Sequence, residues 1–265
     1  MKRVQKSLRE PQSLHDYAQT HPNAACEQMR DYNDQIAHDC RDQSVRDQHG
    51  LCAYCERKIA ADDPFHCHVE HFHQKSDKTG THNWSLDWGN MLAVCDGGSV
   101  GSQQERKKHP LPANLSCDAH KNHMALTGKL PAACEGYLLN PRDIPSFPNL
   151  FTLDKGAGHF KPDEASCASV KIPGNTFGTT GELVSYTITA LNLNCERLAE
   201  KRRCLVVNID QNKKTLRLKG ISPDKVPEKL LPRYFSVKWP EFFTTLRCCL
   251  ATAAEGHLKN MDYQG

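Results

Sequence analysis

The chain has 265 residues, of which 38% are hydrophobic and 25% charged, a balance that predicts a folded globular protein large enough to bury a core. Its net charge of +3 neither indicates nor excludes a nucleic-acid partner, because such binding depends on local patches of charge. No apolar run is long enough to cross a bilayer and no export signal precedes the first helix, so we expect a cytoplasmic protein without membrane contact.

The first 50 residues form a polar region in which sparse apolar residues recur at helical spacing. These apolar residues are Leu14, Tyr17, Met29, Ile36 and Val45. This spacing predicts two or three helices over residues 13–49, the last ending at Gly50. We therefore expect residues 1–50 to be an N-terminal helical region.

Residues 51–125 are dense in cysteine and histidine. The chain has 13 cysteines, an odd number, and without an export signal they indicate metal binding rather than disulfides. Cys52 and Cys55 have the spacing of a zinc knuckle, and Cys95 and Cys117 offer a second pair of thiolates. Four thiolates predict a structural zinc ion. Rival ligands lie nearby: His66, Cys67, His68 and His73.

The other cysteines have no informative spacing, and we expect them to be packed thiols. They are Cys26, Cys40, Cys67, Cys134, Cys167, Cys195, Cys204, Cys248 and Cys249. Residues 96–116, which separate the second pair of zinc ligands, are rich in Gly, Ser and Pro without periodicity and predict a surface loop.

Residues 126–265 begin with a turn-rich segment and continue as a helical region. A short strand or hairpin is expected within 130–162, a helix from about residue 195, and another over 240–254. The final eight residues, 258–265, are expected to fray. Eight Lys or Arg against three acids between residues 195 and 219 can either track a phosphate backbone or form a solvated helix face.

Between the two pairs of cysteines lies an acid–histidine dipeptide, Glu70-His71, followed by Asn90. Taken singly, each has an ordinary explanation: a surface acid, a core histidine, a turn former and, for Asp118, a helix N-cap. Together and in this order, flanked by thiolates, they favour phosphodiester hydrolysis. An imidazole can take the proton of a water molecule at neutral pH.

The order of a C-x2-C knuckle, acid–histidine pair, Asn, Cys and a helix with a later Lys resembles the HNH, or ββα-metal, nucleases. The resemblance covers residues 51–123 and implies a mainly α protein with a small zinc-stapled ββα-metal core. It implies that His71 is the general base, that Glu70 is a metal ligand, and that Asn90 pins a loop.

The family normally has His or Asn after the last knuckle cysteine, where this chain has Asp118. A carboxylate also suits Mg²⁺ or Mn²⁺, so Asp118 is expected to complete the catalytic metal site. His120 is the alternative ligand, with Asn122 another if the helix starts differently. Lys121 falls where the family often has a lysine facing phosphate. Arg106, Lys107 and Lys108 in the loop are the other expected phosphate contacts.

A wider resemblance connects Leu51–Glu56, Val69–Phe72 and Ile188–Leu198 with the HNH subunit of Septu-type anti-phage systems, some of which accompany retrons. It implies an ABC-like ATPase partner docked on the C-terminal helices and, in the retron variant, a reverse transcriptase and its DNA. We therefore expect a metal-dependent endonuclease of DNA or RNA that acts in phage defence. The alternative is a zinc-stabilised nucleic-acid-binding or scaffolding module with a degenerate nuclease centre.

Overall fold

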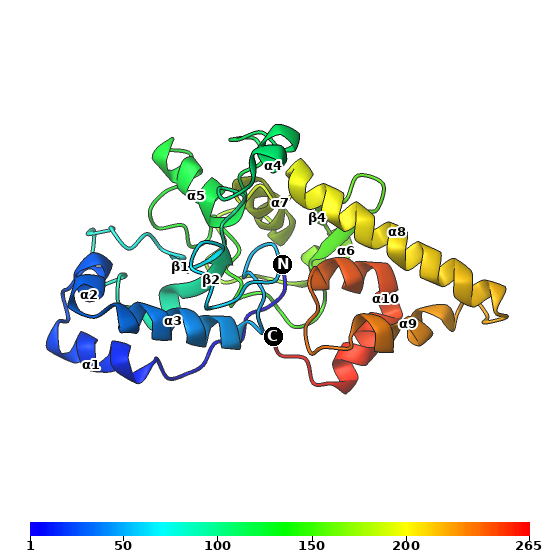
Figure 1. Cartoon of the computed structure of the whole chain (residues 1–265), viewed down its shortest axis with the longest axis horizontal. Helices are drawn as coiled ribbons and strands as arrows, with labels where there is room; N and C mark the ends of the chain where they lie inside the picture. Colours follow the sequence, from blue (N-terminus) through cyan, green and yellow to red (C-terminus); the bar gives the residue numbers. More distant parts are fainter.

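The computed structural model describes all 265 residues and is mainly helical. In Figure 1 the helices of residues 12–47 lie at one end, those of residues 196–260 at the other, and a small sheet lies between them. The two ends of the chain meet near the middle, where the Arg3 amide donates to the Tyr263 hydroxyl over 3.2 Å.

The N-terminal region contains three helices, as predicted: α1 (Gln12–Thr20), α2 (Cys26–Tyr32) and α3 (Asp34–Asp47). Asn33 caps α3, because its side-chain oxygen accepts from the Gln35 amide at 3.0 Å. The chain leaves α3 through Gly50, whose φ of +73° suits glycine. These helices pack with residues 86–91 in a hydrophobic cluster of their own: Leu14, Tyr17, Cys26, Met29, Ile36, Cys40, Leu86, Trp88 and Met91.

The cysteine-rich region forms a two-stranded antiparallel sheet and a helix. Strand β1 (Cys67–His71) pairs with β2 (Met91–Cys95), with Glu70 opposite Leu92. A short 3-10 turn, η1 (Trp88–Asn90), leads into β2, and α5 (Cys117–Leu126) follows the loop. Since β1 pairs only with β2, no strand pairs with its other edge.

The prediction that residues 96–116 are wholly loop was wrong. They contain α4 (Gln103–Lys108), which begins with a capping box in which the Ser102 hydroxyl accepts from the Glu105 amide at 3.2 Å. The Glu105 carboxylate accepts in turn from the Ser102 amide at 2.9 Å. This S-x-x-E pattern was visible in the sequence.

The C-terminal region begins with the predicted hairpin, β3 (Phe151–Asp154) and β4 (His159–Pro162). The helix expected from residue 195 is α8 (Glu196–Leu218), and the last is α10 (Phe243–Asn260), interrupted at Ala251, where φ is +46°. Three further helices complete the region: α6 (Glu164–Ser169), α7 (Thr180–Ala190) and α9 (Val226–Tyr234).

The prediction that residues 258–265 are frayed was also wrong, because Leu258 and Tyr263 are buried. The Tyr263 ring lies 5.0 Å from that of Trp239 and 5.3 Å from that of Phe243. Aromatic packing of this kind outweighs the entropy of a free chain end. Leu258 and Tyr263 therefore belong to the core and anchor the end of the chain.

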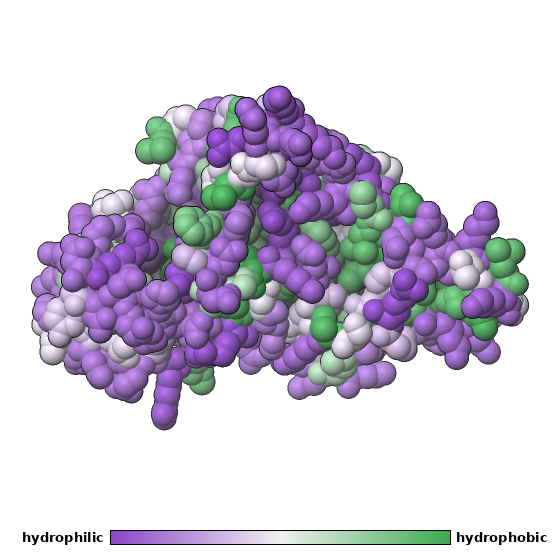
Figure 2. Space-filling view, viewed as in Figure 1, coloured by the Kyte–Doolittle hydropathy of each residue, from purple (hydrophilic) through white to green (hydrophobic).

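The largest hydrophobic core cluster has 41 residues and includes members on both sides of residue 125, such as Leu92 and Leu198. Figure 2 shows a face that is mostly hydrophilic, with small groups of hydrophobic side chains. None of the helices is both long and apolar enough to span a membrane. Of the nine cysteines expected to be packed, seven are buried and Cys248 is half-buried, but Cys204 is exposed.

Candidate functional site

The four cysteines singled out by spacing come together. Cys52, Cys55, Cys95 and Cys117 are all buried, and their sulfur atoms lie within 4.8 Å of one another. The Sγ–Sγ distances are 3.9 Å for Cys52–Cys117, 3.6 Å for Cys55–Cys95 and 3.8 Å for Cys95–Cys117. A tetrahedral zinc ion with Zn–S bonds of about 2.3 Å requires sulfur atoms about 3.8 Å apart. The cluster thus fits zinc, and its distances are far too long for disulfides.

Gly97 allows Cys95 and Cys117, the second pair of ligands, to come together. Its φ is +62°, and a Cβ at this position would lie 2.3 Å from the Ser116 carbonyl oxygen. The Ser116 amide donates to the Gly97 carbonyl at 2.9 Å, which holds the two ends of the 96–116 segment together. The Cys95 amide donates to Cys52 Sγ at 3.3 Å. Neither contact depends on the length of the intervening segment.

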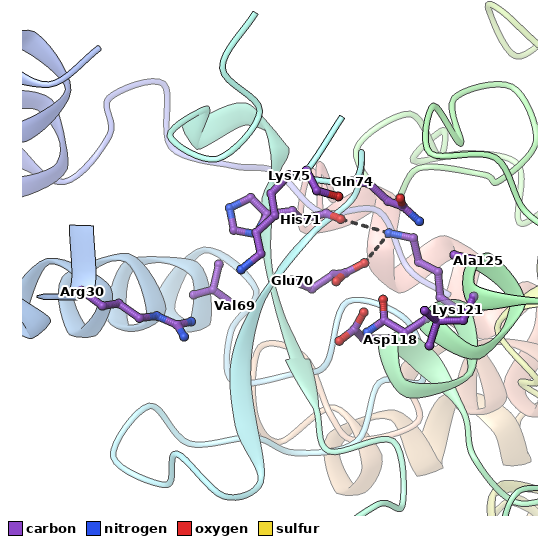
Figure 3. A pocket seen from close by; sticks show the side chains of 12 residues that line it. Arg30, Val69, Glu70, His71, Gln74, Lys75, Asp118, Lys121 and Ala125 are labelled. Atoms are coloured by element: carbon purple, nitrogen blue, oxygen red, sulfur yellow. Dashed lines mark hydrogen bonds and ion pairs between the residues drawn. The ribbon is translucent and has the colours of Figure 1, made fainter. Parts of the chain in front are cut away.

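Beside this cluster lies a cavity of about 560 Å³, here called the first cavity, lined by α2, β1, the segment after β1, and α5. On α5 its lining residues recur with helical periodicity, so one face of the helix meets the cavity. Figure 3 shows Arg30 entering from α2 and Lys75 near His71. The lining residues are Arg30, Val69, Glu70, His71, Gln74, Lys75, Ser76, Asp118, Lys121, Asn122, Ala125 and Leu126.

Two buried carboxylates, Glu70 and Asp118, face each other in the first cavity (Figure 3). Burial raises the pKa of Glu70 well above its usual value; Lys121 opposes this shift and Asp118 adds to it. Burial also acts to raise the pKa of Asp118, but its contacts with Glu70 and His68 outweigh it and lower the pKa to about 2. Asp118 Oδ1 is buried without any hydrogen-bond partner. A hard divalent cation would satisfy this oxygen and relieve the repulsion, so the pair fits such an ion.

Lys121 holds the Glu70 carboxylate in place. Its ammonium donates to Glu70 Oε1, to the His71 carbonyl at 3.0 Å and to the Phe72 carbonyl at 2.6 Å. An ammonium has three hydrogens to donate, and all three are used. Lys121 was expected to face phosphate, but in the structure it is 3% exposed and ties α5 to the end of β1.

His71 is buried, and burial lowers its pKa to about 4, which leaves the imidazole neutral at neutral pH. Its Nε2 lies 3.1 Å from the Ser85 carbonyl oxygen. A carbonyl can only accept, so Nε2 carries the hydrogen and Nδ1 has a free lone pair. His71 is a lining residue of the first cavity and has a nitrogen that can act as a base.

Asn90 does not line the first cavity but pins the loop between β1 and β2. Its Oδ1 accepts from the His73 amide at 2.7 Å, and its Nδ2 donates to the carbonyls of His73 at 3.0 Å and Trp84 at 3.1 Å. That loop carries Ser85, the partner of His71. Asn90 therefore acts on the site through the backbone.

The basic residues expected in residues 96–116 lie elsewhere. Arg106 and Lys108 line a different cavity, and Lys107 is exposed on α4. His120 is also outside the first cavity, since its Nδ1 donates to the Ala190 carbonyl at 2.8 Å and connects α5 with α7. Asp118, not His120, lies beside Glu70.

Three residues near the site were not assigned to it from the sequence. His68 Nε2 lies 2.9 Å from Asp118 Oδ2, and its position two residues before Glu70 on a strand could have placed it on the same face. Arg30 and Lys75 line the first cavity because α2 packs beside the loop after β1, where Lys75 Nζ lies 2.5 Å from Glu27 Oε1. No local sequence pattern predicts that α2 packs beside this loop.

No protein-family model matches the chain. A search of curated proteins finds a relative in Escherichia coli, named "Retron Ec83 putative HNH endonuclease". The two are 37% identical over 214 residues, which is 79% of this chain and 81% of the relative.

Proposed function

Because the chain belongs to the HNH endonuclease family and is a nuclease, we propose that it hydrolyses nucleic-acid phosphodiester bonds in the first cavity, using Mg²⁺ or Mn²⁺ held by Glu70 and Asp118. The observation that carries this proposal is that two buried carboxylates and a neutral imidazole line the same cavity. A bound divalent ion would offset negative charge on the phosphate and on the leaving oxygen. The unpartnered Asp118 Oδ1 is the atom that most requires it.

His71 is the proposed general base. With Nε2–H fixed on the Ser85 carbonyl, Nδ1 is the nitrogen that can accept a proton from water. The Ser85 carbonyl also stabilises the imidazolium that results, because it continues to accept the Nε2 hydrogen. Proton transfer therefore requires no change in the orientation of the ring.

Lys121 and His68 are proposed as positioning residues. Lys121 holds Glu70, and His68 holds Asp118 through Oδ2, which leaves Oδ1 for the ion. Hydrogen bonds of this kind orient ligands and raise metal affinity. The alternative of a degenerate centre rested on the unusual Asp118, and its position beside Glu70 argues against that alternative.

The zinc ion is proposed to be structural. Four cysteines complete its coordination, which leaves no open position for a substrate. Cys117 and Asp118 are consecutive at the start of α5, so the zinc ligand fixes the residue that would hold the catalytic ion. The zinc site is thus a scaffold for the first cavity.

Arg30 and Lys75 are the proposed substrate contacts. Both line the first cavity, and Arg30 has no carboxylate within ion-pair distance. Their role is to hold the phosphates that flank the bond to be cut. Arg30→Ala and Lys75→Ala should raise KM with little change in kcat, whereas Lys78→Ala, an exposed change outside the cavity, should alter neither.

The decisive experiment is cleavage by His71→Ala in Mg²⁺ and in Mn²⁺. Single-stranded DNA, duplex DNA and structured RNA, including transfer RNA, should be tested, because the site is built for the phosphodiester common to all three. Loss of the base should lower kcat by about 10²- to 10⁴-fold, while Mn²⁺ binding persists. His123→Ala is the matched control, an exposed histidine of α5 that does not line the first cavity. If His71→Ala cleaves as fast as the control, the proposed mechanism is refuted.

We also propose that the nuclease acts in phage defence with an ABC-like ATPase subunit and, in a retron, with a reverse transcriptase and its DNA. The name of the Escherichia coli relative supports the connection with a retron. Co-expression with an ATPase encoded beside it should yield a stable complex, and infected cells carrying both should be protected from phage. Protection that persists with His71→Ala would show that cleavage is not the effector step.

A further inference from the structure

A second cavity, larger than the first, lies between α4, the start of α8, the end of α9 and the start of α10. Its volume is about 870 Å³, within the size range of small-molecule sites. The two cavities have no lining residue in common. The nuclease mechanism therefore makes no use of the second cavity.

The second cavity has more positive than negative charge: six Lys or Arg line it against four acids, Asp96, Glu105, Glu200 and Glu241. Lys108 pairs with Glu200, and Arg57 Nη1 lies 3.7 Å from Asp96 Oδ1. Four other cations line the cavity and form no ion pair with any carboxylate of the chain: Arg106, Arg197, Lys201 and Arg233. They come from three helices, so the tertiary fold, not a run of basic sequence, brings them together.

Among these cations, Arg197 is held in place rather than free to extend into solvent. Arg197 Nη2 donates to the Ser116 hydroxyl at 2.7 Å, and its backbone amide donates to Asn114 Oδ1 at 3.0 Å. Arg197 Nη1 is buried and has no partner. Burial and the nearby Arg57 lower the pKa of Lys201, while the nearby Glu241 acts to raise it; an anion in the cavity would further favour the charged form of Lys201.

The lining also has an apolar part. Leu205, Phe242 and Leu246 contribute to it, with the half-buried ring of Tyr234. An isolated phosphate would need only the cations. Apolar lining next to several free cations matches a ligand with a planar base at one end and phosphates at the other.

We propose that the second cavity binds a nucleotide, with its phosphates on Arg197, Lys201 and Arg233 and its base against Leu205 and Phe242. A free nucleoside triphosphate and the terminal nucleotide of a nucleic-acid strand share this chemistry. The proposal does not rest on cleavage in the first cavity.

Cys204 provides a direct assay, because it lines the second cavity and is the exposed cysteine of the chain. Its rate of modification by a maleimide should be measured on the zinc-loaded protein with ATP, GTP, dATP, adenosine, or a short 5′-phosphorylated single strand. The nucleotides should slow modification and adenosine should not. Protection by the nucleotides identifies a free nucleotide as the ligand, and protection by the phosphorylated strand alone identifies a strand end. If none of them protects Cys204, the proposal is refuted.

Affinity measurements on a charge-matched pair of variants complete the test. Lys201→Ala/Arg233→Ala removes two cations of the cavity, and Lys214→Ala/Arg217→Ala removes two exposed cations of α8 outside it. The first should weaken nucleotide binding about 10- to 100-fold and the second by less than about threefold. Equal affinities would overturn the proposal. Unchanged binding by His71→Ala would separate this site from the nuclease centre.

Discussion

Replacing Lys121 with methionine tests whether the buried Lys121–Glu70 pair organises the first cavity. The substitution keeps the length of the side chain but removes the ammonium that donates to Glu70 and to two main-chain carbonyls. Removing one partner of a buried ion pair costs about 3–5 kcal/mol, because the other charge is left without a counter-charge. At about 2–4 °C for each kcal/mol in a protein of this size, the melting temperature should fall by roughly 6–20 °C.

Thermal unfolding followed by circular dichroism measures this change, with Lys107→Met as the control, because Lys107 is exposed and forms no ion pair. Cleavage should fall as well, since Glu70 is no longer oriented. Equal melting temperatures for Lys121→Met and Lys107→Met would refute the buried pair.

Three further predictions concern the scaffold of the site. Cys95→Ser, or zinc removal by a chelator, should abolish cleavage and lower the melting temperature, because Cys117 would no longer fix Asp118. Zinc content and activity should fall together. Activity that survives in zinc-free protein would contradict this prediction. Asn90→Ala should make the loop between β1 and β2 sensitive to protease, since it removes three buried hydrogen bonds at about 1–3 kcal/mol for each group left unpaired; unchanged digestion would count against the pinning role. Tyr263→Ala should lower the free energy of unfolding, measured with denaturant, by about 3–5 kcal/mol, whereas Met261→Ala, a change at an exposed residue, should be nearly neutral. Equal free energies of unfolding for the two variants would show that Tyr263 does not stabilise the fold.

Residue spacing was enough to predict the cysteine quartet, the N-terminal helices, the β3–β4 hairpin, α8 and α10, whereas α4, α6, α7 and α9 were not predicted. A zinc knuckle is a local feature, and closing a long segment costs little, so the chemistry of four thiolates identifies the set before their positions are known. The acid–histidine pair was likewise recognisable from the order of residues. Its roles stay predictions until cleavage is measured.

The sequence misled where the outcome depends on packing partners distant along the chain. The last eight residues look polar and unstructured, but Tyr263 finds Trp239 and Phe243, which no local pattern announces. Lys121 was predicted to contact phosphate and does line the first cavity, but its burial and its three acceptors there could not be predicted from the sequence. The sequence shows which side chains are charged. It does not show whether a charged side chain contacts solvent, substrate or a buried partner in the folded protein.

What the sequence determined by itself is therefore the chemical inventory: four thiolates at metal-binding spacing, an acid beside a histidine, and helices whose periodicity is local. The tertiary structure decided which groups act together. It placed Asp118 against Glu70, brought Arg30 of α2 to the same cavity, and assigned Arg106 and Lys108 to a different one. The physical reason is that periodicity and spacing act over a few residues, while a site is assembled by core packing among elements separated by a hundred or more.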